Sequence, residues 1–127
     1  MAIRTELAVR LQNSPGALTG VCQALAADHI NILALSLEPG GTLRLVVDNP
    51  VHAGGVLRDR HYRVDERDVV YTLVPNEPGS MSRVMGMLSA AGVNVEYAYA
   101  AALESDRAVG VVIGVAEAQR AAALTGM

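Results

Sequence analysis

The pattern of apolar and polar residues divides the chain into short alternating and helical segments. Apolar residues at every second position over 7–11 predict a half-buried strand. Over 18–25 the apolar spacing changes to three and four residues, which predicts an amphipathic helix of roughly three turns. An apolar run over 30–37, a Pro-Gly-Gly turn and alternation over 43–47 predict a hairpin.

The next segment completes one small α/β unit. Asp48-Asn49-Pro50 is a helix start signal, so we expect a short helix around 51–57. Tyr62-Arg63-Val64 predicts a last short strand, and the acidic run that follows (65–68) is interpreted as a solvated linker. The order strand, helix, strand, strand, helix, strand packs as a four-stranded antiparallel sheet with both helices on one face.

The same pattern then returns, so the chain contains an internal repeat. Two motifs recur 63 residues further on, Asn13-Ser14-Pro15-Gly16 as Asn76-Glu77-Pro78-Gly79 and Ile30-Asn31-Ile32 as Val93-Asn94-Val95. Leu45-Val46-Val47 matches Val111-Val112-Ile113 at an offset of 66, which places about three extra residues near Glu104–Arg107. Motifs matched at one offset are hard to obtain by chance, and they indicate a duplication.

The second copy begins near Val69, with a hairpin over 98–113 and a helix near 117–124. No room is left for a final strand, so that strand is either absent or replaced by something that the other copy supplies. We therefore predict an α+β fold of two ferredoxin-like βαββαβ units in tandem, 1–66 and 67–127. Their sheets are expected side by side with the helices on one face.

The Asn-x-Pro-Gly turns are the most informative candidates for chemistry. Proline suits the first turn of a helix, and glycine lets a ligand approach the backbone. The first N–H groups of a helix lack intrahelical acceptors and favour an anion such as a carboxylate. The alternative is that the turns serve only as turn and capping chemistry. Their paired appearance, together with Asn31 and Asn94 between apolar β-branched residues, favours a ligand.

Composition narrows the function classes. Hydrophobic residues make up 51% and charged residues 18% of the chain, enough for a real core. The net charge of −3 argues against nucleic acid, which requires surplus cations. All basic residues are arginine, which excludes lysine Schiff-base chemistry, and a lone Cys22 excludes an intrachain disulfide. We find no nucleophile motif, metal-ligand spacing, membrane span or export signal, so we expect a cytoplasmic protein without catalytic residues, metal or cofactor.

With these motifs the chain resembles the ACT domain, a regulatory amino-acid-binding module, twice over and along nearly its whole length. The whole resembles small stand-alone tandem-ACT proteins, thought to act as amino-acid sensors in biosynthetic regulation. In that family, paired modules bind an amino acid where the turn of one meets the second strand of the other. The resemblance implies one site formed by Asn13, Ser14, Pro15, Gly16, Ala17 and Leu18 facing Asn94 and Val95. It implies a second formed by Asn76, Glu77, Pro78, Gly79, Ser80 and Met81 facing Asn31 and Ile32.

Glu77 replaces Ser14 in the second site and should repel an acidic group, so we expect one strong site without deciding which. The function expected is a non-catalytic regulatory protein that binds a free amino acid, or a similar small carboxylate, and signals to a biosynthetic enzyme. The alternative is an interaction subunit of such an enzyme with no ligand of its own. Because the second copy leaves a sheet edge unprotected, we also expect a homodimer.

Three tyrosines distinguish the second copy. Tyr71, Tyr97 and Tyr99 replace Ala8, Ala34 and Ser36 of the first. If they face away from the helices, they form an aromatic sheet face of the kind that marks an interface. Burial in the core is the other interpretation.

Overall fold

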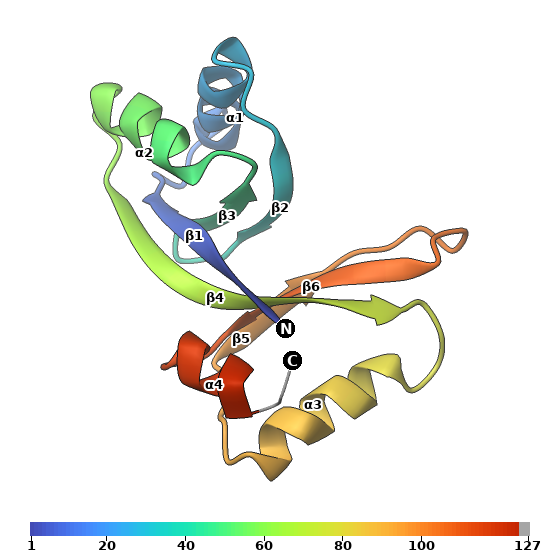
Figure 1. Ribbon diagram of the computed structural model, residues 1–127. Helices are drawn as coiled ribbons and strands as arrows, with labels where there is room; N and C mark the ends of the chain where they lie inside the picture. Colours follow the sequence, from blue (N-terminus) through green and yellow to red (C-terminus); the bar gives the residue numbers. More distant parts are fainter. Residues whose placement is uncertain (125–127) are drawn as a thin grey trace. The chain divides into compact units, whose positions relative to one another are not determined.

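The computed structural model describes residues 1–124 in two compact units (Figure 1). The first unit consists of Thr5–Arg67, and the second consists of Met1–Arg4 together with the chain from Asp68 onward. The last part of the predicted second copy, 125–127, lies outside the described residues. No helix within the described residues is both long and apolar enough to cross a bilayer.

The first unit has the predicted order of strands and helices. Its elements are β1 (Ala2–Arg10), α1 (Ala17–Ala27), β2 (Ile32–Leu37), β3 (Thr42–Val47), α2 (Pro50–Asp59) and the start of β4 (Val64–Pro75). Within this unit the strands lie in the order β2-β3-β1-β4. Antiparallel register sets Leu7 opposite Leu45 and Val9 opposite Leu43. The side chain of Asn49 accepts a hydrogen bond from the His52 N–H at 3.2 Å, which caps α2 as the start signal predicts.

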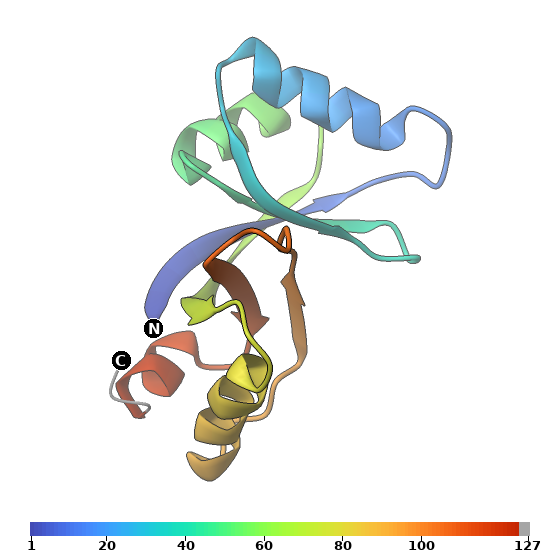
Figure 2. The same ribbon diagram turned by 90° about the vertical axis from the view of Figure 1, so that its right-hand side faces the viewer.

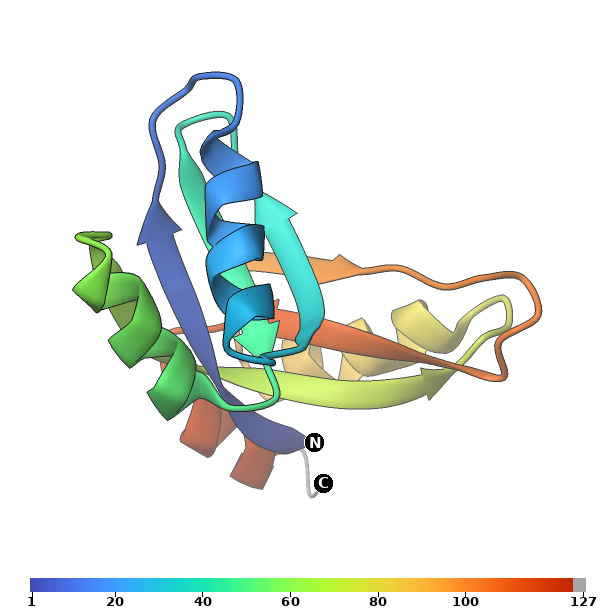
Figure 3. The ribbon, with the colours of Figure 1, turned by 90° about the horizontal axis from the view of Figure 1, so that it is seen from above.

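One face of these strands carries the core of the first unit. Leu7, Val9 and Leu45 pack against Val21 and Leu25 of α1, all with no exposed surface. Leu57 of α2 joins the same core, so both helices cover the same sheet face. Figures 2 and 3 show α1 and α2 side by side over these strands. The alternation and the helical stripe seen in the sequence therefore have a common cause, which is burial of this face.

The second unit repeats the arrangement of strands and helices. Its further elements are α3 (Ser80–Ala90), β5 (Tyr97–Ala100), β6 (Ala108–Gly114) and α4 (Ala118–Leu124). Its strands lie in the order β1-β4-β6-β5, and Val70 is paired with Ile113 in the β4–β6 ladder. Val70, Ile113 and Leu88 belong to its core, and Met1 packs against that core. Of the two alternatives for the missing last strand, the second is correct, because Met1–Arg4 belong to this unit.

One expectation about the junction is wrong. The sequence predicts a strand ending at Val64 and a solvated linker at 65–68, but β4 runs unbroken from Val64 to Pro75. Asp65, Glu66 and Asp68 are exposed within that strand. Charged residues can belong to a strand when their side chains project to solvent. The side chains of Val64, Val69 and Val70 in the same strand are buried. The last strand of the first copy and the first strand of the second copy are therefore one strand.

The tyrosines of the second copy face away from the helices. In the ladders Tyr71 and Tyr99 both lie opposite Val112, whereas the core residue Ile113 pairs with Val70 and Ala98. The rings of Tyr97 and Tyr99 are stacked with centroids 6.4 Å apart. All three tyrosines are half-buried, so the aromatic sheet face is confirmed and core burial is not.

Candidate functional site

The turn between β1 and α1 leaves backbone donors at the start of a helix. Gly16 precedes α1 with a φ of 84° and no side chain caps the helix. Glycine adopts this left-handed conformation without steric cost. The Ala17 N–H donates to the Ser14 carbonyl at 3.3 Å, but the N–H groups of Leu18 and Thr19 have no acceptor within the described residues. Free donors at the positive end of a helix favour a bound anion.

A hollow of about 330 Å³ opens beside these donors. It is lined on one side by the turn and the first residues of α1, and on the other by the turn between β2 and β3. The lining residues are Leu11, Gln12, Asn13, Ser14, Gly16, Ala17, Leu18, Thr19, Leu37, Glu38, Pro39 and Gly41. A Cβ atom added at Gly16 would meet no atom of the described residues within 4 Å, so none of their side chains lies directly over this glycine.

Glu38 brings a fixed negative charge to the opposite wall of this hollow. The Arg44 Nε donates to the Glu38 carboxylate at 2.5 Å, and Arg44 also pairs with Glu6 at 3.1 Å. Glu6 is fully buried, so it anchors Arg44, and Arg44 in turn holds Glu38. The two walls are joined at Gly41, which accepts a hydrogen bond from the Leu11 N–H at 2.8 Å.

Gly41 is required at this junction for two reasons. Its φ is +91°, a conformation that side chains disfavour. A Cβ atom there would also lie 2.5 Å from the Leu11 carbonyl oxygen. The close approach of the two backbones therefore sets the width of the hollow.

The corresponding turn of the second copy is occupied by the protein's own groups. Asn76 donates through its side-chain amide to the carbonyls of Leu103 and Asp106 at 3.1 and 2.9 Å. Glu77 pairs with Arg83 at 3.1 Å, and the Arg83 guanidinium also donates to the Ser80 hydroxyl. The extra residues predicted between 104 and 107 thus form the longer hairpin loop that engages Asn76.

The first copy has no such groups over its turn. Asn13, the counterpart of Asn76, makes no side-chain hydrogen bond within the described residues. The counterpart of Arg83 is Gly20, which has no side chain to reach the turn. Arg83 by contrast lies 3.6 Å from the position of a Cβ atom on Gly79. The two turns share the same backbone form, with φ of 84° and 87°, but differ in what covers them.

The other predicted site residues have simpler surroundings. Asn31 precedes β2 and exchanges backbone contacts with Asp48, whose carboxylate accepts from the Asn31 N–H at 3.1 Å. Asn94 is exposed in the segment before β5. Ile32 and Val95 pack against the cores of their own units.

The remaining predicted residues divide between the two turns. Pro15 and Pro78 are exposed, Met81 is 40% exposed, and Ser80 is buried at the start of α3. Each predicted site combines residues of both units, since 13–18 and 94–95 belong to different units, as do 76–81 and 31–32. The proposed pairing across copies therefore stays a prediction.

Sequence reasoning missed one wall of the hollow. The sequence pattern predicts only a hairpin and its turn for Leu37, Glu38, Pro39 and Gly41. Nothing in the local pattern marks them as ligand-facing, because they meet the Asn-x-Pro-Gly turn only through the β1–β3 ladder. A carboxylate directly before a Pro-Gly-Gly turn is the one available signal, and alone it is weak.

Comparison with known proteins agrees with this architecture. The family model described as an ACT domain pair matches residues 1–124. The crystal structure of protein BT0572 from Bacteroides thetaiotaomicron is 35% identical, with a TM-score of 0.90 over 98% of this chain and 87% of that one. Among curated proteins the comparison gives no significant match.

More distant structures share the fold. The regulatory subunit of aspartate kinase from Thermus thermophilus, in its ligand-free form, gives a TM-score of 0.71 at 18% identity over 98% and 92% of the two chains. The same subunit from Thermus flavus gives 0.68 at 18% identity over 98% and 94%. The repeated strand, Asn-x-Pro-Gly turn and helix, the two ferredoxin-like units and the family match lead to one conclusion: the chain belongs to the family of ACT domain pairs.

Proposed function

We propose that this chain is a non-catalytic regulatory protein that binds a free amino acid in the hollow beside the β1–α1 turn. The observation that carries the proposal is the pairing of opposite groups across that hollow. Free N–H groups of Leu18 and Thr19 suit the ligand carboxylate, and Glu38 suits its ammonium group. A single cavity with both kinds of partner matches a zwitterion better than a simple anion.

The rest of the hollow suits an amino-acid side chain. Leu11, Leu18, Leu37 and Pro39 provide apolar surface, and Asn13 offers an amide that can donate and accept. The volume lies at the lower end of the range for small-molecule sites, about 300–1,000 Å³. Asn94 and Val95, expected from the other copy, remain predicted additions to this site.

Of the two predicted sites, we assign ligand binding to the first-copy turn. The second-copy turn already satisfies Asn76 with hairpin carbonyls and places the Glu77–Arg83 pair beside its glycine. A ligand there would have to displace those contacts, which lowers its net affinity.

Regulation follows if the ligand binds one conformation more tightly than another, since only differential affinity shifts an equilibrium. We propose a biosynthetic enzyme as the partner, in line with the regulatory subunits of aspartate kinase among the structural neighbours. In this proposal the protein acts in the cytoplasm.

Calorimetry of the full chain with each standard amino acid tests the proposal. We expect one amino acid to bind, and Glu38→Gln to weaken it at least tenfold, about 1.4 kcal/mol, because the ammonium loses its charged partner. Glu77→Gln is the matched control at the second-copy turn and should leave the affinity unchanged. Equal weakening by both variants would reject the assignment to the first copy, and no binding of any amino acid would favour the ligand-free interaction subunit.

A further inference from the structure

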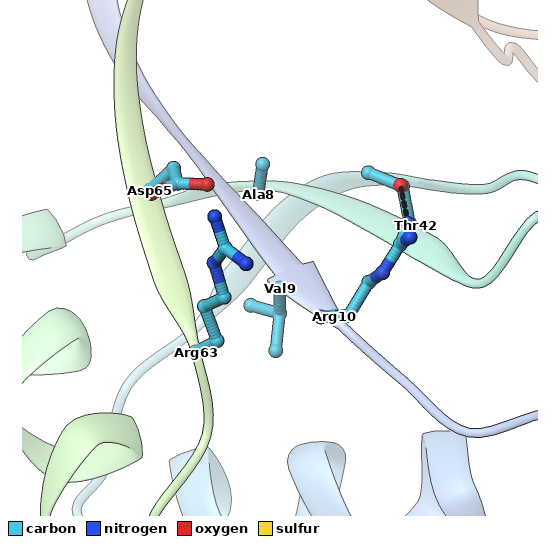
Figure 4. A pocket seen from close by; sticks show the side chains of 6 residues that line it. All are labelled: Ala8, Val9, Arg10, Thr42, Arg63 and Asp65. Carbon is cyan, nitrogen blue, oxygen red and sulfur yellow. Dashed lines mark hydrogen bonds between the residues drawn. The ribbon is translucent and has the colours of Figure 1, made fainter.

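A second, smaller hollow lies on the sheet face of the first unit that is turned away from its helices. Its volume is about 190 Å³, and it is lined by Ala8, Val9, Arg10, Thr42, Arg63 and Asp65 (Figure 4). The core residues Val9 and Val64 point to the helix side. Arg10 of β1 and Arg63, the residue before β4, project to the opposite face (Figure 4). This hollow shares none of its residues with the one assigned to the amino acid.

Two guanidinium groups border this hollow without a carboxylate partner. The backbone N–H of Arg10 donates to the Arg63 carbonyl at 3.2 Å, so the two arginines are neighbours on adjacent chain segments. Within the described residues the Arg63 side chain makes no hydrogen bond or ion pair, and the Arg10 guanidinium contacts only the Thr42 hydroxyl, at 3.2 Å. Figure 4 shows the Arg63 guanidinium directed toward Asp65 and the Arg10 guanidinium toward Thr42, so the two cations border the hollow from different sides.

The single acidic group here leaves the charge unbalanced. Asp65 lines the same hollow, yet it forms no ion pair within 4.0 Å among the described residues. A neighbouring hollow of about 510 Å³ shares Arg10 and Arg63 and adds Arg60 and His61, with no acidic residue in its lining. On its other side it borders the amino-acid hollow, with which it shares Leu11, Gln12, Ser14 and Ala17. A chain with a net charge of −3 thus gathers three of its ten arginines around two adjoining hollows.

The duplication provides an internal comparison. The second-copy counterparts of Ala8 and Arg10 are Tyr71 and Leu73. A Cβ atom on Gly110 would collide with the Tyr71 hydroxyl, so the tyrosine covers the sheet there. In the first copy the small Ala8 leaves this space open, and arginines surround it (Figure 4). Ala8 and Arg10 of the cationic hollow are therefore not repeated in the second copy.

We propose that this hollow binds a phosphate group, free or as the monoester of a small molecule. Guanidinium groups present paired N–H donors that match phosphate oxygens, and the Thr42 hydroxyl adds a neutral donor. The hollow has a volume of about 190 Å³, several times the roughly 30 Å³ that one water molecule occupies in the liquid, so it has room for one such group. The organic part of an ester extends toward Arg60 and His61 in the neighbouring hollow.

Titration of the full chain with inorganic phosphate, by calorimetry at constant ionic strength, tests the proposal. We expect saturable binding that Arg63→Gln weakens at least tenfold, because one of the two guanidinium donors is lost. Arg120→Gln removes an exposed arginine of the second unit and should leave phosphate affinity unchanged. Absence of binding to the unaltered chain, or equal weakening by both variants, would overturn the proposal.

Two further variants report on the hollow itself. Ala8→Tyr installs the second-copy residue and should abolish phosphate binding while circular dichroism and thermal unfolding show a folded chain. If it does not fold, Ala8→Leu serves the same purpose with a smaller side chain. Asp65→Asn removes the opposing charge and should tighten phosphate binding, whereas weaker binding would overturn a purely anionic ligand.

Different probes separate the possible sources of the phosphate group. Tighter binding of glycerol 3-phosphate than of inorganic phosphate would support an ester, and the reverse would support the free ion. Succinate, which carries the same charge, is the control, and equal affinity for it would overturn the assignment to phosphate. Amino-acid binding measured with Glu38→Gln is independent of all these outcomes, so either proposal can fail alone.

Discussion

His29 adopts a left-handed backbone conformation at the end of α1, with a φ of 56°. It follows the helix cap Asp28, and its N–H donates to the Ala26 carbonyl at 3.0 Å. The residue 63 positions later is Gly92, which ends α3 in the same way with a φ of 72°. A β-carbon makes this conformation costly, so the first copy carries a strain that the second copy avoids.

Replacing His29 by glycine should therefore stabilise the chain by about 1 kcal/mol. Glycine removes the strain of the left-handed conformation, and the greater flexibility that it gives the unfolded chain offsets part of this gain. Urea unfolding measures it. The reciprocal change, Gly92→His, should lower the free energy of unfolding by a similar amount. Loss of stability in His29→Gly would mean that the imidazole makes a contribution larger than the backbone strain.

At the scale of elements, the β5–β6 ladder contains a glycine beneath an aromatic ring. Tyr97 lies opposite Gly114, and a Cβ atom on Gly114 would collide with three carbons of its ring. Rings that cover cross-strand glycines are a known way to pin strand register. This explains why glycine interrupts the otherwise apolar β6 on the face opposite the core.

Gly114→Ala should cost about 1–3 kcal/mol, because the Tyr97 ring must leave its position. The same substitution in a Tyr97→Ala background should cost much less, since the added methyl group then meets no ring. A double-mutant cycle of thermal unfolding gives this coupling directly. Equal costs in both backgrounds would place the defect in the strand backbone.

Local elements could be predicted from the sequence because their apolar spacing reflects burial on one face. Leu18, Val21 and Leu25 lie within α1 at the spacing of one helix face. The motifs that recur 63 residues later then predict α3 as the repeat of α1. Contacts between distant segments could not be predicted. Glu38 comes near the Asn-x-Pro-Gly turn only through the β1–β3 ladder. At the second turn, Glu77 pairs with Arg83, whose counterpart in the first copy is Gly20.

At the scale of the molecule, the second unit contains residues from both sequence copies. Met1 packs against the core of the second unit, and the Arg4 guanidinium lies 5.2 Å from the centre of the Tyr71 ring. A cation at this distance over an aromatic ring contributes about 0.5–1 kcal/mol at an exposed site. The amino-terminal residues thus stabilise the unit that follows Arg67.

Removal of residues 1–4 should selectively weaken the second unit. Hydrogen exchange followed by mass spectrometry should show faster exchange in β6 (108–114), while β3 (42–47) exchanges as before. The variant Arg4→Gln, which keeps the strand and loses the cation, should give a smaller change. Faster exchange in both strands would contradict a contribution confined to one unit.

The homodimer also stays a prediction at this scale. The sheet edge expected to be unprotected in the second copy is covered, because β4 lies between β1 and β6. Strand β2 lies at the end of its strand order and exposes Leu33, Leu35 and Leu37 by 44–46%. Unpaired strand edges with apolar side chains favour association with another chain. Analytical ultracentrifugation at micromolar concentration should give a dimer mass, and a single monomeric species would contradict the prediction.

The unbroken β4 has a consequence for how this gene can change. A flexible tether tolerates insertions and deletions, but residues 64–67 and 68–75 share one pleat with a period of two. A single codon gained or lost near Asp68 would turn Val70 outward and Tyr71 inward, inverting every later position of that strand. Length variation at the boundary should therefore be confined to even numbers of residues or be absent, and engineered fusions should join the halves elsewhere.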